Sequence, residues 1–421
     1  MESQQHHQEL LQKYAEAIVR VGLNLRAGQR LIITNATARG VPPAGRALVH
    51  AVTKAAYAAG ARFVDVIWGD EEMLRLRLQH APADSFSEYP KWMVSGILDM
   101  LKNGDALLSI YANDPDVYRG LDFERVGAMQ HGHLENWAPI SELVTRNASN
   151  WSIAAAAAPA WAAKIFPDLD PEEAMGKLWQ AIFETTRATA TDPVAAWEEH
   201  IKNLRKRANY LQAKKYSALH YKSDKTDFTL GLPNGHKWIS AQSLAENGVA
   251  FTANMPTEEV FTLPDRHRAD GIVTSTFPLS YGGSLIEDFS VKFENGKIVK
   301  VTAKKNEAIL QKLVDTDEGS TRLGEVALVP ASSPIAQRGH LFYNTLFDEN
   351  ASCHIAIGRG YRFTLTGGEE LTDEEFNAAG GNTSLNHVDF MIGSPQMDID
   401  GIREDGTREP VMRQGEWAFD V

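Results

Sequence analysis

A histidine and an aspartate stand two residues apart near the C-terminus, where His387 and Asp389 are followed by the apolar run 390–392. Successive side chains of a β-strand point to opposite faces, so residues i and i+2 share a face. In a strand, His387 and Asp389 would therefore project together while the apolar run anchors the strand. Imidazole nitrogens and carboxylate oxygens are common ligands of zinc and similar divalent ions. The pair predicts one side of a metal site.

Other segments of the second half also place polar or ionisable side chains beside apolar runs. Glu325 opens the run 325–329, which is expected to be buried. An isolated ionised carboxylate in a protein interior costs several kcal/mol or shifts its pKa, and a bound cation would supply the missing counter-charge. No HExxH zinc motif is present. Together these segments favour a metal-dependent hydrolase. They are residues 254–261, 322–329, 346–356 and 360–363.

Each of these residues also has an ordinary structural explanation. Glu259 could cap a turn or face solvent, and Glu325 could be hydrated at the start of its strand. A single core histidine such as His354 is more often hydrogen-bonded than bound to a metal. The pair of His387 and Asp389 is the strongest signal, because the strand period brings both side chains to one face. The residues alone therefore leave the site open.

Three weaker patterns suggest rival sites. Cys353 and His354 invite a cysteine-protease interpretation, but neighbouring side chains of a strand point away from each other. His131 and His133 could form a second metal pair in a strand, although a pair of polar loop histidines is the simpler interpretation. The basic cluster 266–268 could meet a substrate carboxylate, or equally lie in a solvated turn or a dimer contact.

The composition limits the possible partners. The chain has 421 residues and a formal net charge of −13, which disfavours nucleic acid and anionic membranes as partners. Its one cysteine, Cys353, allows no intramolecular disulfide and suits the reducing cytoplasm. We see no signal-peptide pattern and no apolar stretch long enough to cross a membrane. The sequence therefore predicts a soluble cytoplasmic protein.

The first half of the chain reads as an α/β domain. Apolar residues at helical spacing predict a helix over 9–21, and a second helix over 42–59 ends at Gly60. Short apolar runs predict buried strands, and their alternation with helices indicates a parallel sheet. The predicted strands are residues 31–34, 63–68, 105–111 and 151–156. A helical region from 171 to about 211 follows.

The sequence pattern of the second half predicts an α+β domain with a largely antiparallel sheet. Asn295-Gly296 between two alternating runs is a strong hairpin signal, and Pro233-Asn234-Gly235 between 227–232 and 237–240 suggests another. A helix is expected over 306–315. Further strands are predicted at 325–330, 358–366 and 387–392. We place the domain boundary near residue 210, with an α/β domain over 1–210 and the metal-binding catalytic domain over 211–421.

The strings around these polar residues, in their order and spacing, resemble the thermophilic metallo-aminopeptidases of peptidase family M29. The resemblance covers essentially the full chain and is most specific in the second half. It implies metal ligands at Glu259, Glu325, Glu349, His354, His387 and Asp389. It also implies an active-site tyrosine at Tyr361, a homodimer, and two divalent ions per subunit, which could be cobalt, zinc, magnesium or manganese. Glu258 and Asp348 are less favoured as ligands.

This resemblance implies an aminopeptidase that releases N-terminal residues from peptides with metal-activated water. Glu325 or Glu259 would carry the proton of that water to the leaving amine, and Tyr361 would donate a hydrogen bond to the oxyanion. An amidase or esterase acting on blocked substrates is the nearest alternative. A non-catalytic ligand-binding protein is weaker, because residues 35–40 contain neither a dinucleotide fingerprint nor a P-loop. A structural protein held together by the ions is the last alternative.

Overall fold

The computed structural model describes residues 2–35, 39–281 and 284–421, and contacts divide the chain into two compact units. The first unit contains residues 1–199 and 242–256, and the second contains residues 200–241 and 257–421. The division falls within helix α8 (Pro193–Lys214). The predicted boundary at residue 210 stays a prediction. No described helix is both long and apolar enough to cross a membrane.

The first unit is built on a parallel sheet with the strand order β2-β1-β3-β4. Its strands are β1 (Arg30–Thr34), β2 (Phe63–Val66), β3 (Ala106–Tyr111) and β4 (Trp151–Ala155). Ile32 and Leu107 pack against helices α4 (Lys91–Lys102) and α5 (Phe123–Thr145) on one face of the sheet, and the remaining apolar residues of β1 are also buried. Such runs without alternation are typical of parallel strands covered on both faces. The predicted α/β domain is confirmed.

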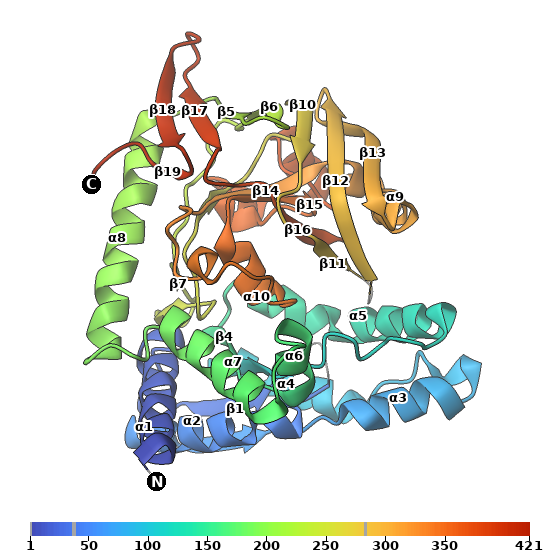
Figure 1. Ribbon diagram of the computed structural model, residues 1–421, viewed down its shortest axis with the longest axis vertical. Coiled ribbons are helices and arrows are strands. Elements are labelled where there is room, and N and C mark those ends of the chain that lie inside the picture. The colour runs from blue at the N-terminus through green and yellow to red at the C-terminus, as the bar shows by residue number, and fades with distance from the viewer. Residues whose placement is uncertain (1, 36–38, 282–283) are drawn as a thin grey trace. The chain divides into compact units, whose positions relative to one another are not determined.

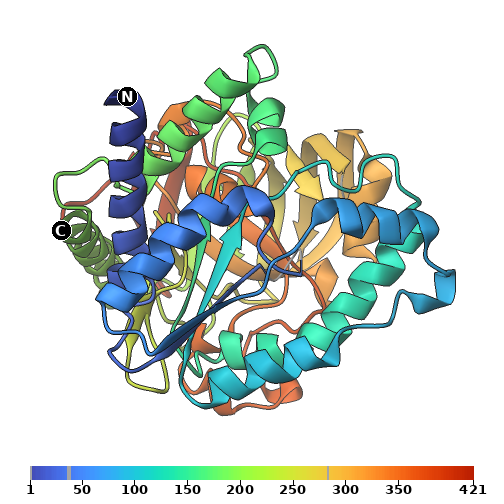
Figure 2. The ribbon, with the colours of Figure 1, turned by 90° about the horizontal axis from the view of Figure 1, so that it is seen from below.

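Helices surround the strands of this unit, as Figure 2 shows in blue through green. They are α1 (Glu2–Ala17), a π-helix (Ile18–Gly22), α2 (Arg46–Ala58), α3 (Glu71–His80), α4 (Lys91–Lys102), α5 (Phe123–Thr145), α6 (Pro159–Ile165) and α7 (Pro171–Thr185). A short antiparallel pair, β7 (Gln242–Leu244) and β8 (Ala250–Thr252), completes it.

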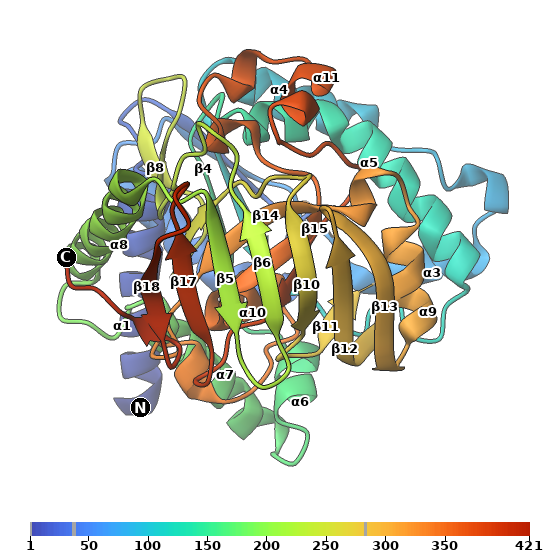
Figure 3. The ribbon, with the colours of Figure 1, turned by 90° about the horizontal axis from the view of Figure 1, so that it is seen from above.

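The second unit contains two antiparallel sheets, which confirms the predicted character of this half. The described residues of the larger one form nine strands, most of which lie side by side in Figure 3. They are β5 (Ala218–Lys222), β6 (Asp227–Gly231), β10 (Ala269–Thr274), β11 (Leu279–Tyr281), β12 (Ser284–Glu294), β13 (Lys297–Lys305), β17 (Asp398–Ile402), β18 (Arg408–Arg413) and β19 (Glu416–Trp417). Buried and accessible residues alternate along β12, as expected for a sheet with one solvated face.

The smaller sheet has the order β16-β15-β14-β9 (Figure 1), and four of the six predicted metal ligands lie on its strands. Its strands are β9 (Val260–Thr262), β14 (Leu323–Leu328), β15 (His354–Gly358) and β16 (His387–Met391). Every residue of β14 and β15 is buried, so polar side chains on these strands have little access to water. Helices α9 (Glu307–Val314), α10 (Thr345–Asp348) and α11 (Asp373–Ala378) belong to the same unit.

Two local predictions differ from the structure. Residues 237–240 form no strand; β6 instead makes a hairpin with β5 and pairs with β10 on its other side. The predicted strand 358–366 is wrong, because β15 ends at Gly358 and the chain turns away from the sheet after it. Residues 362–364 form a 3₁₀ turn. The Asn295-Gly296 hairpin is confirmed, and both residues adopt positive φ as that turn requires.

Candidate metal centre

The register of the smaller sheet brings four predicted ligands to one face. Glu325 on β14 and Asp389 on β16 both pair with Ala356 of β15, so the three residues form one row across the sheet. Directly paired residues share a face, as do residues two apart along a strand. His354 lies two residues before Ala356, and His387 two residues before Asp389. The four ionisable side chains therefore project together, as the strand period predicted for the last pair.

The side chains of these residues form two overlapping groups. In each group, the candidate ligand atoms all lie within 4.8 Å of one another. One group contains Glu259, Glu325 and His354, and the other contains Glu325, His387 and Asp389. His354 Nε2 lies 3.1 Å from a carboxylate oxygen of Glu259 and 3.6 Å from one of Glu325. His387 Nε2 lies 3.5 Å from Asp389 and 3.8 Å from Glu325. Glu325 is thus shared between the groups.

Glu349 and Tyr361 lie next to these groups without belonging to either. The charges of Glu259 and Asp389 add to the effect of burial and raise the pKa of Glu349 well above its usual value. The Tyr361 ring lies 4.8 Å from the His387 ring between centroids. Burial, with the charges of Glu325 and Asp389, raises the pKa of Tyr361 well above 10.0, so its hydroxyl stays protonated and able to donate.

Burial among like charges perturbs the whole cluster. Burial is the main cause that raises the pKa of Glu325 to about 7. Burial alone would lower the pKa of both histidines, but the neighbouring carboxylates reverse this. They raise the pKa of His387 to about 9 and that of His354 well above 6.5. The carboxylates therefore favour the protonated, positively charged form of both histidines.

The donor set fits divalent cations. Two carboxylate oxygens, Glu259 Oε2 and Asp389 Oδ1, are buried and accept no hydrogen bond although a histidine lies near each. Both histidines use their other nitrogen locally: Nδ1 of His387 lies 2.7 Å from the Arg359 carbonyl, and Nδ1 of His354 lies 3.1 Å from that of Ser352. A carbonyl only accepts, so Nδ1 carries a proton, and in the neutral ring Nε2 presents a lone pair. This arrangement is typical of histidines that bind metals.

The structure distinguishes the less favoured acidic residues from the predicted ligands. Glu258 points to His200, with Nε2 3.5 Å from its carboxylate, while Glu259 joins the cluster. Asp348 accepts backbone N–H groups from Phe342 and Asn344 at 2.7 and 2.9 Å, so it holds a loop. No pattern in the sequence separates Glu258 from Glu259.

The rival sites are not assembled. The thiol of Cys353 contacts the backbone of Val329, away from the cluster, and burial raises its pKa to about 11. His131 and His133 lie on α5 and not on a strand. His131 lies near Glu135, and Nδ1 of His133 is 3.1 Å from the Tyr89 hydroxyl.

The basic cluster 266–268 is also engaged within the protein. Arg266 is buried against Glu318, and Arg268 pairs with Asp265. Both guanidinium groups are therefore paired with carboxylates of the chain itself.

Comparisons with known proteins show the family of this chain. The family model described as Thermophilic metalloprotease (M29) matches residues 7–417. The chain is 46% identical to Aminopeptidase AmpS of Bacillus subtilis (strain 168), with 97% of this chain and 98% of that protein covered. It is 45% identical to Aminopeptidase T of Thermus thermophilus, again covering 97% and 98%. The solved structure of wild-type AmpT from Thermus thermophilus superposes with a TM-score of 0.91 at 44% identity, covering 97% of this chain and 99% of that one.

The match to the family model spans both units. The two relatives are named aminopeptidases, and this chain covers nearly their whole length. The buried cluster of carboxylates and histidines offers candidate ligands for the metal of such an enzyme. This chain therefore belongs to the thermophilic metalloprotease (M29) family and is a metal-dependent aminopeptidase.

Proposed function

We propose that the protein removes N-terminal residues from peptides with the help of two divalent ions per subunit. Six residues would hold the ions: Glu259, Glu325, Glu349, His354, His387 and Asp389. The observation that carries this proposal is the pair of overlapping ligand groups that share Glu325. Four ionised carboxylates with neutral histidines carry a formal charge of −4, which two divalent ions would neutralise.

The ions, when bound, supply Lewis-acid polarisation of the scissile carbonyl and lower the pKa of the attacking water. Glu325 or Glu259 would accept the proton of that water and transfer it to the leaving amine. Burial raises the pKa of Glu325 to about 7, so this carboxylate can exchange protons near neutral pH. Tyr361 donates a hydrogen bond to the developing oxyanion. Carboxylate oxygens of the centre accept hydrogen bonds from the free α-amino group of the peptide, which selects its N-terminus.

The choice of ion follows from the donors. Imidazole nitrogen with carboxylate oxygen suits zinc, cobalt and manganese, and carboxylate oxygen also suits magnesium. The test compares a leucyl peptide with its N-acetylated twin before EDTA treatment, after it, and after each of Co²⁺, Zn²⁺, Mg²⁺ and Mn²⁺ is added back. We expect cleavage of the free-amine peptide alone, loss of that cleavage with EDTA, and recovery with at least one ion. Equal cleavage of the acetylated peptide would instead indicate an amidase or endopeptidase.

We further propose a cytoplasmic homodimer. The single cysteine is free and buried, as suits a reducing compartment. Helices α3, α4 and α5 of the first unit expose large apolar side chains, which commonly mark interaction surfaces. They are Met73, Trp92, Phe123 and Leu134, each more than 60% exposed. Light scattering after gel filtration should give twice the chain mass, and Trp92→Ser should shift the protein toward monomer. A wild-type monomer at micromolar concentration would refute the dimer.

A further inference from the structure

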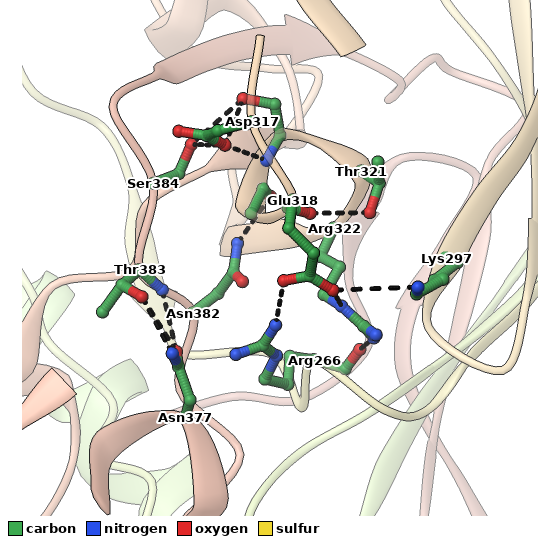
Figure 4. Close-up of polar contacts among 12 residues, drawn as sticks. Arg266, Lys297, Asp317, Glu318, Thr321, Arg322, Asn377, Asn382, Thr383 and Ser384 are labelled. Carbon is green, nitrogen blue, oxygen red and sulfur yellow. Dashed lines mark hydrogen bonds and ion pairs between the residues drawn. The ribbon is translucent and has the colours of Figure 1, made fainter. Parts of the chain in front are cut away.

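A fully buried asparagine connects three segments at one end of the smaller sheet. The side-chain amide of Asn382 donates to the carbonyls of Gly319 and Gly358 at 2.8 and 2.6 Å. Its own backbone carbonyl accepts from the N–H of Gly360 at 2.8 Å. Figure 4 shows this amide within a wider polar network. Asn382 thus joins the approach to β14, the turn after β15, and the segment that enters β16.

The turn held by Asn382 carries the partner of a proposed metal ligand. Arg359 lies between Gly358 and Gly360, both of which are hydrogen-bonded to Asn382. The carbonyl of Arg359 accepts a hydrogen bond from Nδ1 of His387 at 2.7 Å. The N–H of Arg359 donates to Asn386 at 2.7 Å, which closes the turn against the residue before His387. Tyr361 follows directly, and its ring packs on that of His387. A shift of this turn would move the acceptor that orients His387.

Close packing leaves the turn little room to adjust. A side chain at Gly358, whose φ is 105°, would collide with the carbonyl of Asn386. A Cβ at Gly360 would lie 2.5 Å from Leu263 and 3.1 Å from the carbonyl of Gly324. Asn382 adds two hydrogen bonds to this tightly packed turn, one from its amide to the Gly358 carbonyl and one from the N–H of Gly360 to its backbone carbonyl.

The neighbouring network fixes the same segment at other points. Asp317 accepts from Ser384, and Asn377 donates to the Thr383 hydroxyl at 2.8 Å and accepts from its N–H at 3.0 Å (Figure 4). Glu318 pairs with Arg322, which stabilises the approach to β14. Because these contacts do not involve residues 358–360, they offer a control for the effect of Asn382.

We propose that Asn382 is a positioning residue for the metal centre. Its amide holds the turn 358–360 so that the Arg359 carbonyl keeps the proton of His387 on Nδ1 and leaves Nε2 available to an ion. This inference rests on the proposed role of His387 as a ligand. Residues that orient metal-binding histidines typically change metal affinity by about 10–100-fold when they are replaced.

The test measures metal affinity directly and not only activity. Co²⁺ is titrated calorimetrically into metal-free wild type, Asn382→Ala, Asn377→Ala and His387→Ala, and urea unfolding gives the stability of each. Asn377→Ala removes hydrogen bonds to Thr383 from the same segment, so it matches Asn382→Ala except at the turn. We expect Asn382→Ala to lose about 10–100-fold in affinity for the ion bound by His387. Asn377→Ala should bind Co²⁺ like the wild type even where it loses comparable stability.

The outcomes separate this inference from the proposed function. Wild-type affinity in Asn382→Ala, or equal losses in both asparagine variants, would overturn the positioning role. Unchanged affinity in His387→Ala would instead refute the ligand assignment on which it rests. If Asn382→Ala does not fold, Asn382→Ser keeps a short donor, and the same loss of affinity relative to Asn377→Ser is expected. Nitrogen NMR of the His387 ring should then show a smaller share of the Nδ1-protonated tautomer.

Discussion

Buried carboxylates occur in both units, but their surroundings differ. In the first unit, Asp105 is 7% exposed and meets Arg30, whose backbone N–H donates at 2.8 Å and whose Nε donates at 2.6 Å. In the second unit, Glu325 is 6% exposed and faces other acidic residues, with His354 and His387 beside it. One carboxylate has a permanent cation within the chain, and the other does not.

The comparison separates a structural charge from a functional one. Arginine stays protonated, so Asp105 is neutralised at every working pH and joins the start of β1 to the start of β3. The acidic cluster around Glu325 is neutralised only by protons or by added cations. Glu325 and Asp389 face histidines and other carboxylates, an arrangement that suits a site for metal ions.

The largest expected effect is that of Glu325→Gln, which removes the residue shared by both ligand groups. We expect kcat/KM for a leucyl peptide to fall by at least about 10³-fold, about 4 kcal/mol of transition-state stabilisation, because a neutral amide is a poorer ligand and a poorer base. Elemental analysis should find fewer bound ions. Normal activity with a full complement of ions would remove the distinction between Glu325 and an ordinary buried carboxylate.

Tyr361→Phe tests whether the centre does more than hold ions. The hydroxyl of Tyr361 faces the charges of Glu325 and Asp389 and remains protonated. Loss of one oxyanion donor typically costs about 10²–10³ in rate, so kcat should fall by that factor with bound metal unchanged. A variant with wild-type kcat would exclude the proposed role, whereas loss of metal would show that the ring mainly supports His387.

Without metal ions, the stability of the protein should depend on pH, because the charges of the cluster are then uncompensated. The pKa of Glu325 is raised by burial from 4.5 to about 7, so the folded protein binds the extra proton and loses stability as pH rises through this range. The pKa of His387 is raised from 6.5 to about 9, and its contribution is lost as pH rises through 9.

Both shifts act in one direction, so the free energy of unfolding of the metal-free protein should decrease between about pH 4.5 and 9. Urea unfolding at several pH values in EDTA measures this, and saturating ion at the alkaline end should restore stability. A metal-free protein that becomes more stable across the same range would contradict the account.

The sequence predicts those parts of this centre that depend on local periodicity. His387 and Asp389 share a face because the strand period requires it, and Asn295-Gly296 forms its turn because both residues tolerate positive φ. Glu325 can belong to both ligand groups because of the register between β14 and β15. Residues far apart in the chain determine this register. The fold class could likewise be predicted from patterns, whereas the pairing of β6 with β5 and β10 could not.

The contribution of Asn382 has no sequence signal. A buried amide that bridges two carbonyls shows neither periodicity nor a charged neighbour, and it is recognised only when Gly319 and Gly358 are brought together. The predicted strand over 358–366 failed for a related reason. The apolar pattern of that segment suits a strand, but tertiary hydrogen bonds bend its backbone into a turn at Gly358.

The smallest expected effect on catalysis is that of Asp105→Asn, which completes the comparison from the structural side. The amide can still accept from the backbone N–H of Arg30, but it loses the charge-assisted bonds to the guanidinium. Hydrogen bonds to charged groups contribute about 1.5–3 kcal/mol, so the free energy of unfolding in urea should fall by up to that amount. Bound metal and kcat should stay at wild-type values, because Asp105 belongs to the unit that contains no proposed ligand. A loss of metal or of kcat larger than the loss of folded protein would mean that this carboxylate also serves the centre, and the two kinds of buried carboxylate would then no longer be distinguishable by their neighbours alone.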